Sequence, residues 1–336
     1  MKRWVLANSV EGMPQASDFL LREELDGAPN AGEIAVKISY HTVAPGIRSK
    51  MGHETYTAMI RPGDQIPGMG VGVVTASRHP KFAPGDIAWG EMAWATAAVR
   101  PGDSVEKLDR EAFGSLPLYA ALSTLGPSGL TAYFGLVRVA QLKAGDVLLV
   151  SAAAGAVGST VGQIARLLGA RVVGIAGSDA KCAEIIREFG YHAAINYRTE
   201  SDLDAAIRRE CPDGVDVYFD NVGGEITDAA FRCMKAFGRI VVCGQTTEYN
   251  ATEPRGWREA ALSTSKRLKI QGFIVFDFRD EFPAAIREMS GWMKSGALVC
   301  KPTIVDGIEN SATAFVSLFQ EGGRGRVLVR ANADDR

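Results

Sequence analysis

The hydrophobic residues of this chain follow two different patterns, and the change between them predicts two domains. Up to about residue 120, short segments alternate between apolar and polar residues and are separated by Gly and Pro, which is typical of β-strands joined by tight turns. We expect strands here at residues 34–40, 68–76 and 86–92. Pro-Gly pairs mark turns at residues 62–63, 67–68, 84–85 and 101–102.

From about residue 121 the pattern changes to apolar strands that alternate with helical segments, which predicts a parallel sheet covered by helices. The expected strands are residues 147–150, 172–176, 193–196, 215–220, 240–244 and 270–276. Strand-like segments return at about residue 298 and end with residues 326–329. We therefore predict an α/β protein with a doubly wound domain, residues 121–297, inserted into a discontinuous β-barrel domain, residues 1–120 and 298–336.

The segment at residues 147–169 (VLLVSAAAGAVGSTVGQIARLLG) is an apolar strand that runs through a turn of small residues into a helix. Ala152, Gly155 and Gly158 form an Ala-x-x-Gly-x-x-Gly variant of the dinucleotide-binding fingerprint. Small side chains let the backbone N–H groups at the helix start approach a pyrophosphate, and the helix dipole favours its negative charge. A tight strand-to-helix turn in another kind of α/β protein would show the same pattern.

The end of the second strand of this domain distinguishes NAD from NADP. Enzymes that bind NAD place an acid there to hold the ribose 2′-hydroxyl, whereas this strand ends at Gly177-Ser178. Ser178 and Lys181 can instead bind a 2′-phosphate, although Lys181 also fits an ordinary solvated helix position. Asp179 fits a helix N-cap or first-turn position. These residues favour NADP(H).

Composition excludes several classes of function. The 336 residues exceed the size at which a single core usually keeps growing, and 46% hydrophobic with 23% charged residues is typical of a globular protein. A net charge of −2 provides no general attraction to nucleic acid or to anionic membranes. No apolar run reaches the roughly 18 residues of a membrane span. We therefore expect a cytoplasmic protein that binds neither nucleic acid nor membranes.

The cysteines and histidines predict no metal site. The five cysteines include no Cys-x-x-Cys pair and lie in the second half of the chain, at positions 182, 211, 233, 243 and 300. Gly52-His53-Glu54 is similar to the catalytic-zinc triplet of alcohol dehydrogenases. That triplet directly precedes a glycine-rich segment, which here comes later, at residues 66–74, and contains no His or Glu. Too few ligands therefore converge on His53 for the three or four that zinc needs.

Several segments together resemble the zinc-free leukotriene hydroxydehydrogenase/prostaglandin reductase family of medium-chain dehydrogenase/reductases, which also includes plant alkenal double-bond reductases and bacterial curcumin reductases. They span nearly the whole chain, at residues 3–7 (RWVLA), 129–135 (GLTAYFG), 152–158, 218–224 (YFDNVGG) and 243–245 (CGQ). The resemblance implies a Rossmann domain inserted in a GroES-like domain, with NADP(H) as cofactor. It also implies α,β-unsaturated ketones or aldehydes as substrates, and a homodimer formed through the edge strand at residues 270–276.

The resemblance assigns roles to individual residues. It places Gly155, Ala156, Val157 and Gly158 at the pyrophosphate, Lys181 and Tyr197 at the 2′-phosphate, and Asn221 and Cys243 at the ribose and nicotinamide. Phe273, Ile274 and Val275 match the segment beside the nicotinamide, and Thr131, Ala152, Ser178 and Gly244 complete the expected cofactor contacts. Tyr249 matches the tyrosine that reaches the substrate carbonyl.

The chemistry of Tyr249 agrees with this role. Reducing a carbon–carbon double bond conjugated to a carbonyl places negative charge on the carbonyl oxygen, and a neutral phenol can stabilise that charge without a metal. An ordinary loop tyrosine packed on an apolar wall would also fit this position. Asn221 similarly fits both a ligand-binding strand end and a turn before two glycines.

Two positions depart from the family. Ala44-Pro45-Gly46-Ile47-Arg48 stands where the family usually has Asp-Pro-Tyr-Met-Arg, which predicts a wider or differently shaped substrate pocket. The segment Gly323-Arg324-Gly325-Arg326 replaces Asn-x-Gly-Lys, so an amide that contacts the cofactor is absent. These departures leave open a nucleotide-binding protein without turnover. A zinc-free carbonyl or quinone reductase on the same scaffold also stays open, because cofactor motifs do not specify the acceptor.

Overall fold

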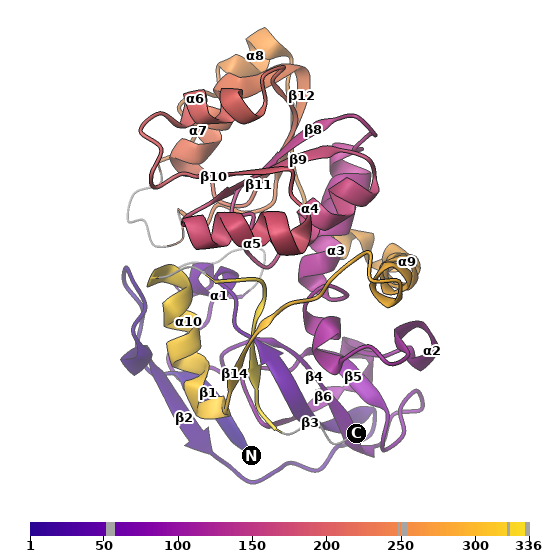
Figure 1. Ribbon diagram of the computed structural model, residues 1–336. Coiled ribbons are helices and arrows are strands. Elements are labelled where there is room, and N and C mark those ends of the chain that lie inside the picture. Colours follow the sequence, from indigo (N-terminus) through magenta and orange to yellow (C-terminus); the bar gives the residue numbers. More distant parts are fainter. Residues whose placement is uncertain (52–57, 248, 250–254, 321–322, 333–336) are drawn as a thin grey trace. The chain divides into compact units, whose positions relative to one another are not determined.

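The computed structural model of the chain, shown in Figure 1, describes residues 1–51, 58–247, 249, 255–320 and 323–332. The chain divides into two compact units, which we call unit 1 (Met1–Ser123 with Pro302–Arg336) and unit 2 (Thr124–Lys301). The domain boundaries predicted from the sequence were 120/121 and 297/298. No helix in the described part of the chain has the length and apolarity needed to cross a membrane.

Unit 1 consists mainly of β-strands. Its seven-stranded sheet has the order β14-β15-β3-β4-β5-β7, with β6 paired to β3, and β1 and β2 form a separate antiparallel pair. The strands are β1 (Lys2–Leu6), β2 (Phe19–Glu23), β3 (Glu33–Thr42), β4 (Met69–Ser77), β5 (Ile87–Glu91), β6 (Ala97–Pro101), β7 (Val105–Lys107), β14 (Thr303–Asp306) and β15 (Val327–Arg330). The helices are α1 (Gly46–Ser49), α2 (Arg110–Phe113) and α10 (Ser311–Gln320), with 3₁₀ turns at Ala16–Asp18, Gly102–Ser104, Leu118–Leu122 and Ile308–Asn310.

The core of unit 1 joins segments from both ends of the chain. Trp94 is fully buried and contacts Phe315 of α10 edge to face, with 5.5 Å between the ring centroids. His41 is also fully buried, and its Nε2 atom lies 3.1 Å from the Ser311 hydroxyl. Burial lowers the pKa of His41 to about 3, because a charged imidazole would lose its hydration there. His41 is therefore a neutral packing residue that ties β3 to α10.

Unit 2 contains a parallel six-stranded sheet with the order β10-β9-β8-β11-β12-β13. The strands are β8 (Val147–Val150), β9 (Arg171–Ala176), β10 (Ala193–Asn196), β11 (Val215–Asp220), β12 (Met234–Val242) and β13 (Lys269–Gly272). The helices are α3 (Pro127–Phe134), α4 (Gly158–Leu167), α5 (Asp179–Phe189), α6 (Leu203–Glu210), α7 (Gly224–Cys233), α8 (Leu262–Lys266) and α9 (Phe282–Lys294), with a π-helical turn at Gly135–Ala140 and a 3₁₀ turn at Val275–Glu281.

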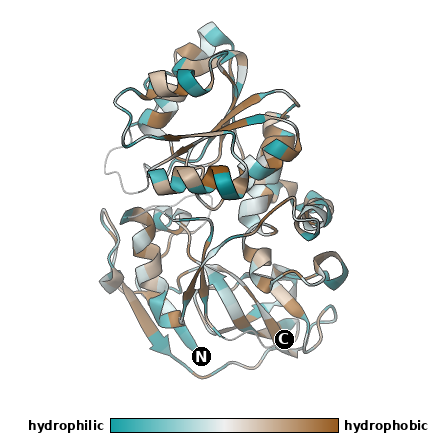
Figure 2. Ribbon diagram, viewed as in Figure 1, coloured by the Kyte–Doolittle hydropathy of each residue, from teal (hydrophilic) through white to brown (hydrophobic). Residues whose placement is uncertain are grey.

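The strand order of unit 2 confirms the predicted doubly wound fold. From β8 the chain builds outward to β10 on one side, then returns to β11 and builds outward to β13 on the other. Helices α3, α4 and α5 cover one face, and α6, α7 and α8 form the second layer (Figure 1). The strands are largely hydrophobic, whereas the helices carry both colours (Figure 2), as expected for helices with one face on the sheet. The order reverses between β8 and β11, and ligands of such sheets bind at the carboxyl ends of the strands there.

The prediction of a strand at residues 270–276 is wrong for its second half. Strand β13 ends at Gly272, which pairs with Val242, the last residue of β12. Beyond this point no described strand continues the ladder, and Val275–Glu281 forms a 3₁₀ turn. Phe278 in this turn stacks on Phe134 of α3 with 4.9 Å between the ring centroids, which fixes the new direction of the chain.

Candidate active site

The turn between β8 and α4 carries the predicted phosphate-binding residues. Ala152 adopts a left-handed conformation with φ of +47°, and its carbonyl accepts a 2.8 Å hydrogen bond from the Gly155 N–H. A Cβ atom at Gly158 would lie only 2.4 Å from the Ala152 carbonyl oxygen, so this turn requires glycine. The N–H groups of Ala156, Val157 and Gly158 donate to no acceptor among the described residues. Three free donors at the start of a ten-residue helix suit the pyrophosphate of a dinucleotide.

Tyr191, which the sequence analysis missed, holds this helix against the sheet. Its hydroxyl donates a 2.6 Å hydrogen bond to the Gly158 carbonyl. Its ring fills the space between α4 and β9, because a Cβ atom at Gly162 or Gly174 would lie 2.0 Å or 2.9 Å from it. Burial raises the pKa of Tyr191 and keeps its hydroxyl protonated. Its position between two glycines distant in sequence explains why no local motif pointed to it.

The ends of β9 and β10 bring together the predicted 2′-phosphate residues. Ser178 is the N-cap of α5, and its hydroxyl accepts a hydrogen bond from the Lys181 N–H at 3.3 Å. Tyr197 follows β10 and lies beside Gly177, since a Cβ atom at Gly177 would be 3.3 Å from the Tyr197 hydroxyl. Asp179 is the first residue of α5, which is the first-turn position of the two that the sequence allowed. Its carboxylate accepts a 2.7 Å hydrogen bond from the Asn196 amide.

The end of β11 is fixed by a buried polar network around Asp220 and Asn221. The Asn221 backbone N–H donates to the Ser151 hydroxyl at 2.9 Å, and its side-chain amide donates to the Ser151 carbonyl at 2.8 Å. The fully buried Asp220 carboxylate accepts hydrogen bonds from two backbone N–H groups and from the hydroxyls of Tyr218 and Thr227. Burial raises the pKa of Asp220, and these donors act in the opposite direction. The network clamps the ends of β8 and β11 together.

The segment after β12 brings Tyr249 close to this network. The N–H groups of Cys243 and Gly244 donate to the Asp220 carbonyl at 2.8 and 3.1 Å. A Cβ atom at Gly244 would lie 3.4 Å from both the Tyr249 hydroxyl and the Asn221 carbonyl oxygen. The half-buried Tyr249 therefore directs its hydroxyl to the carboxyl ends of β11 and β12. Burial, with a contribution from the Asp220 charge, raises the pKa of the Cys243 thiol to about 12 and keeps it protonated.

The remaining predicted cofactor residues lie on α3 and after β13. Phe273, Ile274 and Val275 follow the strand instead of belonging to it. The Phe273 ring approaches the end of α3, since a Cβ atom at Gly135 would be 3.1 Å from its Cζ atom. Thr131 on α3 donates its hydroxyl to the Pro127 carbonyl at 2.7 Å, which leaves the oxygen free to accept.

Unit 1 holds the residues that depart from the family. Gly46 begins α1, and a Cβ atom there would meet nothing within 4 Å, so the space beside it is open. Gly323 lies before β15, and a Cβ atom added there would lie 3.2 Å from the Leu318 side chain. Within the described residues, no three His, Cys, Asp or Glu side chains lie close enough together to hold a metal, and His53 and Glu54 lie outside those residues.

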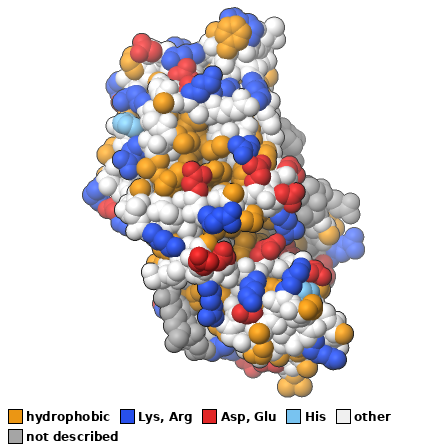
Figure 3. All heavy atoms as spheres, turned by 90° about the vertical axis from the view of Figure 1, so that its right-hand side faces the viewer, with side chains coloured by type: hydrophobic (Ala, Val, Ile, Leu, Met, Phe, Trp, Pro, Cys, Tyr) orange, Lys and Arg blue, Asp and Glu red, His pale blue; other side chains and the backbone are white. Residues whose placement is uncertain are grey.

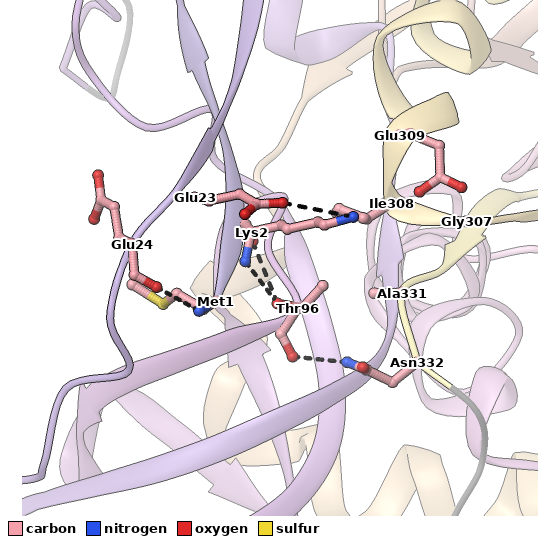
Figure 4. A pocket seen from close by; sticks show the side chains of 10 residues that line it. All are labelled: Met1, Lys2, Glu23, Glu24, Thr96, Gly307, Ile308, Glu309, Ala331 and Asn332. Carbon is pink, nitrogen blue, oxygen red and sulfur yellow. Dashed lines mark hydrogen bonds and ion pairs between the residues drawn. The ribbon is translucent and has the colours of Figure 1, made fainter.

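A separate pocket of unit 1 gathers none of the predicted site residues. It has a volume of about 480 Å³ and is lined by Met1, Lys2, Glu23, Glu24, Thr96, Gly307, Ile308, Glu309, Ala331 and Asn332 (Figure 4). Several of its polar groups already bond one another; the Asn332 amide, for example, donates to the Thr96 carbonyl at 2.8 Å. We therefore assign the candidate site to the strand ends of unit 2.

Comparisons with known proteins agree with this fold. A family described as zinc-binding dehydrogenase matches residues 156–291, and one described as N-terminal domain of oxidoreductase matches residues 2–108. Prostaglandin reductase 1 of Bos taurus is 38% identical over 332 residues, which cover 98% of this chain and 99% of that protein. The NADP(+)-dependent 2-alkenal reductase of Nicotiana tabacum is 36% identical over 339 residues, which cover 99% of this chain and 98% of that protein. The crystal structure of CurA from Vibrio vulnificus in complex with NADPH matches with a TM-score of 0.92 at 33% identity, covering 99% of this chain and 100% of that one.

Proposed function

Because the chain belongs to the prostaglandin reductase and alkenal reductase family of medium-chain dehydrogenase/reductases, we propose that it reduces the carbon–carbon double bond of α,β-unsaturated ketones or aldehydes. Like its relatives in this family, it is an NADP-dependent oxidoreductase. The observation that carries the proposal is the position of the Tyr249 hydroxyl beside Gly244 and Asn221, at the strand ends where doubly wound sheets bind ligands. A hydrogen-bond donor there can stabilise a carbonyl oxygen that gains charge.

The residues present fit the dinucleotide. The free N–H groups of Ala156, Val157 and Gly158 would bind its pyrophosphate, and Ser178, Lys181 and Tyr197 would bind its 2′-phosphate. Asn221, Cys243, Gly244 and the segment Phe273 to Val275 would line the ribose and nicotinamide, with Ala152 and Thr131 beside them. When bound, NADPH supplies a hydride.

Tyr249 would act on the substrate carbonyl. As the β-carbon of the substrate is reduced, the electron pair of its double bond moves to the carbonyl oxygen, which becomes an enolate. The neutral Tyr249 hydroxyl would donate a hydrogen bond to this oxygen and keep its own proton. The α-carbon then takes a proton from water, which completes the saturated carbonyl product.

A matched substrate panel tests this function. We expect NADPH oxidation with an enone and with a 2-alkenal, and product masses that increase by the two hydrogen atoms added across the double bond. The saturated ketone of the same carbon skeleton serves as the control and should not be reduced. Reduction of that ketone to an alcohol, or of a quinone alone, would make the chain a carbonyl or quinone reductase. Binding of NADPH without turnover on any of these compounds would indicate a nucleotide-binding protein.

We also expect turnover to be independent of metal. The Tyr249 hydroxyl is an organic donor that can polarise the carbonyl, and the described residues offer no cluster of three metal-ligating side chains to do so instead. Dialysis against a chelator such as EDTA should leave kcat on a good enone unchanged, with metal content checked by mass spectrometry. Activity that disappears on dialysis and returns with added zinc would contradict this expectation and would direct attention to His53 and Glu54.

The edge of the sheet of unit 2 favours a homodimer. Strand β13 pairs with β12 on one side, and no described strand pairs with its other side. An open strand edge invites pairing with a second copy, and Phe276 just beyond it is 44% exposed. The face drawn in Figure 3 shows hydrophobic side chains among charged ones. Light scattering at micromolar concentration should give about twice the 35.9 kDa mass of the chain; a monomeric mass would contradict the proposal.

A further inference from the structure

Arg198, which no motif pointed to, lies at the end of β9 together with Tyr197. A Cβ atom at Gly177 would lie 3.4 Å from the Arg198 Nε atom and 3.1 Å from the Tyr197 ring. The two side chains therefore fold from the end of β10 across the end of β9. The Arg198 guanidinium carbon lies 5.8 Å from the centre of the Tyr197 ring, within the range of a cation–π contact. The glycine at position 177 makes room for both side chains.

Apart from its contact with the Tyr197 ring, the Arg198 guanidinium has no partner in the described part of the chain. Its side chain is exposed and makes no ion pair or hydrogen bond with a described residue. The nearby acid Asp179 already accepts a hydrogen bond from Asn196, and Asn196 also accepts from the Arg198 backbone N–H at 3.2 Å. The hydrogen bond to Asn196 holds the Arg198 backbone in place, while the Arg198 guanidinium remains available to an anion.

We propose that Arg198 is a second cation for the 2′-phosphate of NADPH and, with Lys181, sets the preference for NADPH over NADH. The inference rests on the proposed phosphate site at Ser178, Lys181 and Tyr197. The end of the second strand is where dinucleotide-binding sheets meet the 2′ position of the ribose, and a nearby arginine suits a phosphate there. The planar guanidinium can donate two parallel hydrogen bonds to a phosphate, whereas a lysine donates from a single point.

A pair of ligands that differ only in the 2′-phosphate tests this role without measuring activity. Adenosine 2′,5′-bisphosphate and AMP are titrated by calorimetry into the full-length wild-type protein and the R198Q, R198K, K181Q and R22Q variants. R198Q keeps a polar side chain of similar reach but removes the charge. R22Q makes the same charge change at Arg22, an exposed residue of β2 in unit 1, and is the matched control.

We expect R198Q to weaken the bisphosphate by about tenfold and to change AMP binding by less than about twofold. R198K should recover part of the loss, and R22Q should match wild type for both ligands. If K181Q weakens the bisphosphate selectively and R198Q does not, the role of Arg198 is wrong but the phosphate site stands. If neither variant distinguishes the two ligands, the proposed phosphate site itself is wrong. Equal weakening of both ligands by R198Q would also overturn the proposal, because it would show a general effect on the adenosine site.

Discussion

Replacing Tyr249 by Phe should lower kcat and kcat/KM together, by about tenfold to a hundredfold on a simple enone. A donor that acts only as charge develops on the carbonyl oxygen stabilises the transition state and not the bound substrate. Removing a single such donor typically costs about 10²–10³ in rate, and the ribose hydroxyl of the cofactor can replace part of it, which places the expected loss at the lower end. Steady-state kinetics with saturating NADPH measures both parameters.

Two comparisons separate this role from packing. The dissociation constant of NADPH should stay within about twofold of wild type in Y249F, because the phenol hydroxyl acts on the substrate. Y133F is the matched control, since the hydroxyl of Tyr133 donates to the exposed Glu288 at 2.6 Å and lies outside the proposed machinery. Full kcat in Y249F on a good enone would show that Tyr249 is only a packing residue.

Replacing Lys181 by Ala should weaken NADPH by about 1.5–3 kcal/mol, a factor of roughly 10–150, and leave NADH nearly unchanged. Lys181 is half-buried on the first turn of α5, next to the Ser178 N-cap. A phosphate bound there loses a charge-assisted hydrogen bond, whereas the ribose hydroxyl of NADH never made one. Fluorescence titration with each reduced cofactor provides both dissociation constants.

The K81A variant controls for the change in net charge. Lys81 is an exposed residue of unit 1 that pairs with Asp103 at 2.9 Å, and its loss should leave both cofactor affinities unchanged. Equal weakening of NADPH and NADH by K181A would remove Lys181 from the phosphate site.

The parts of the fold that follow from local patterns were predicted from the sequence. The strands β8, β10 and β11 were predicted at their observed bounds; β8 is a continuous apolar run, as expected for a strand covered on both faces, and β10 and β11 are mostly apolar segments between helical ones. The small residues between β8 and α4 similarly predicted the helix start with free N–H groups. Both features depend on residues that lie close together in the chain.

The parts that depend on distant contacts were missed. Tyr191, Asp220 and Arg198 matter because of what the fold brings next to them, and no spacing along the chain reveals those neighbours. The strand at residues 270–276 was extended too far for the same reason: its apolar residues continue, but β12 ends at Val242 and leaves them no partner. The side chains of Phe273 and Phe278 pack against aromatic and backbone groups of α3 instead.

The discontinuity of unit 1 sets an order of events during synthesis. A ribosome completes residues 124–301 before it makes β14, α10 and β15, so the nucleotide-binding sheet can close while unit 1 still lacks its last elements. Until then the end of β3 has no β15 beside it, and Trp94 lacks the ring of Phe315. An unpaired strand edge beside a tryptophan that lacks part of its covering is prone to aggregation. Of the two units, the nascent unit 1 is therefore the one with the greater need of a chaperone.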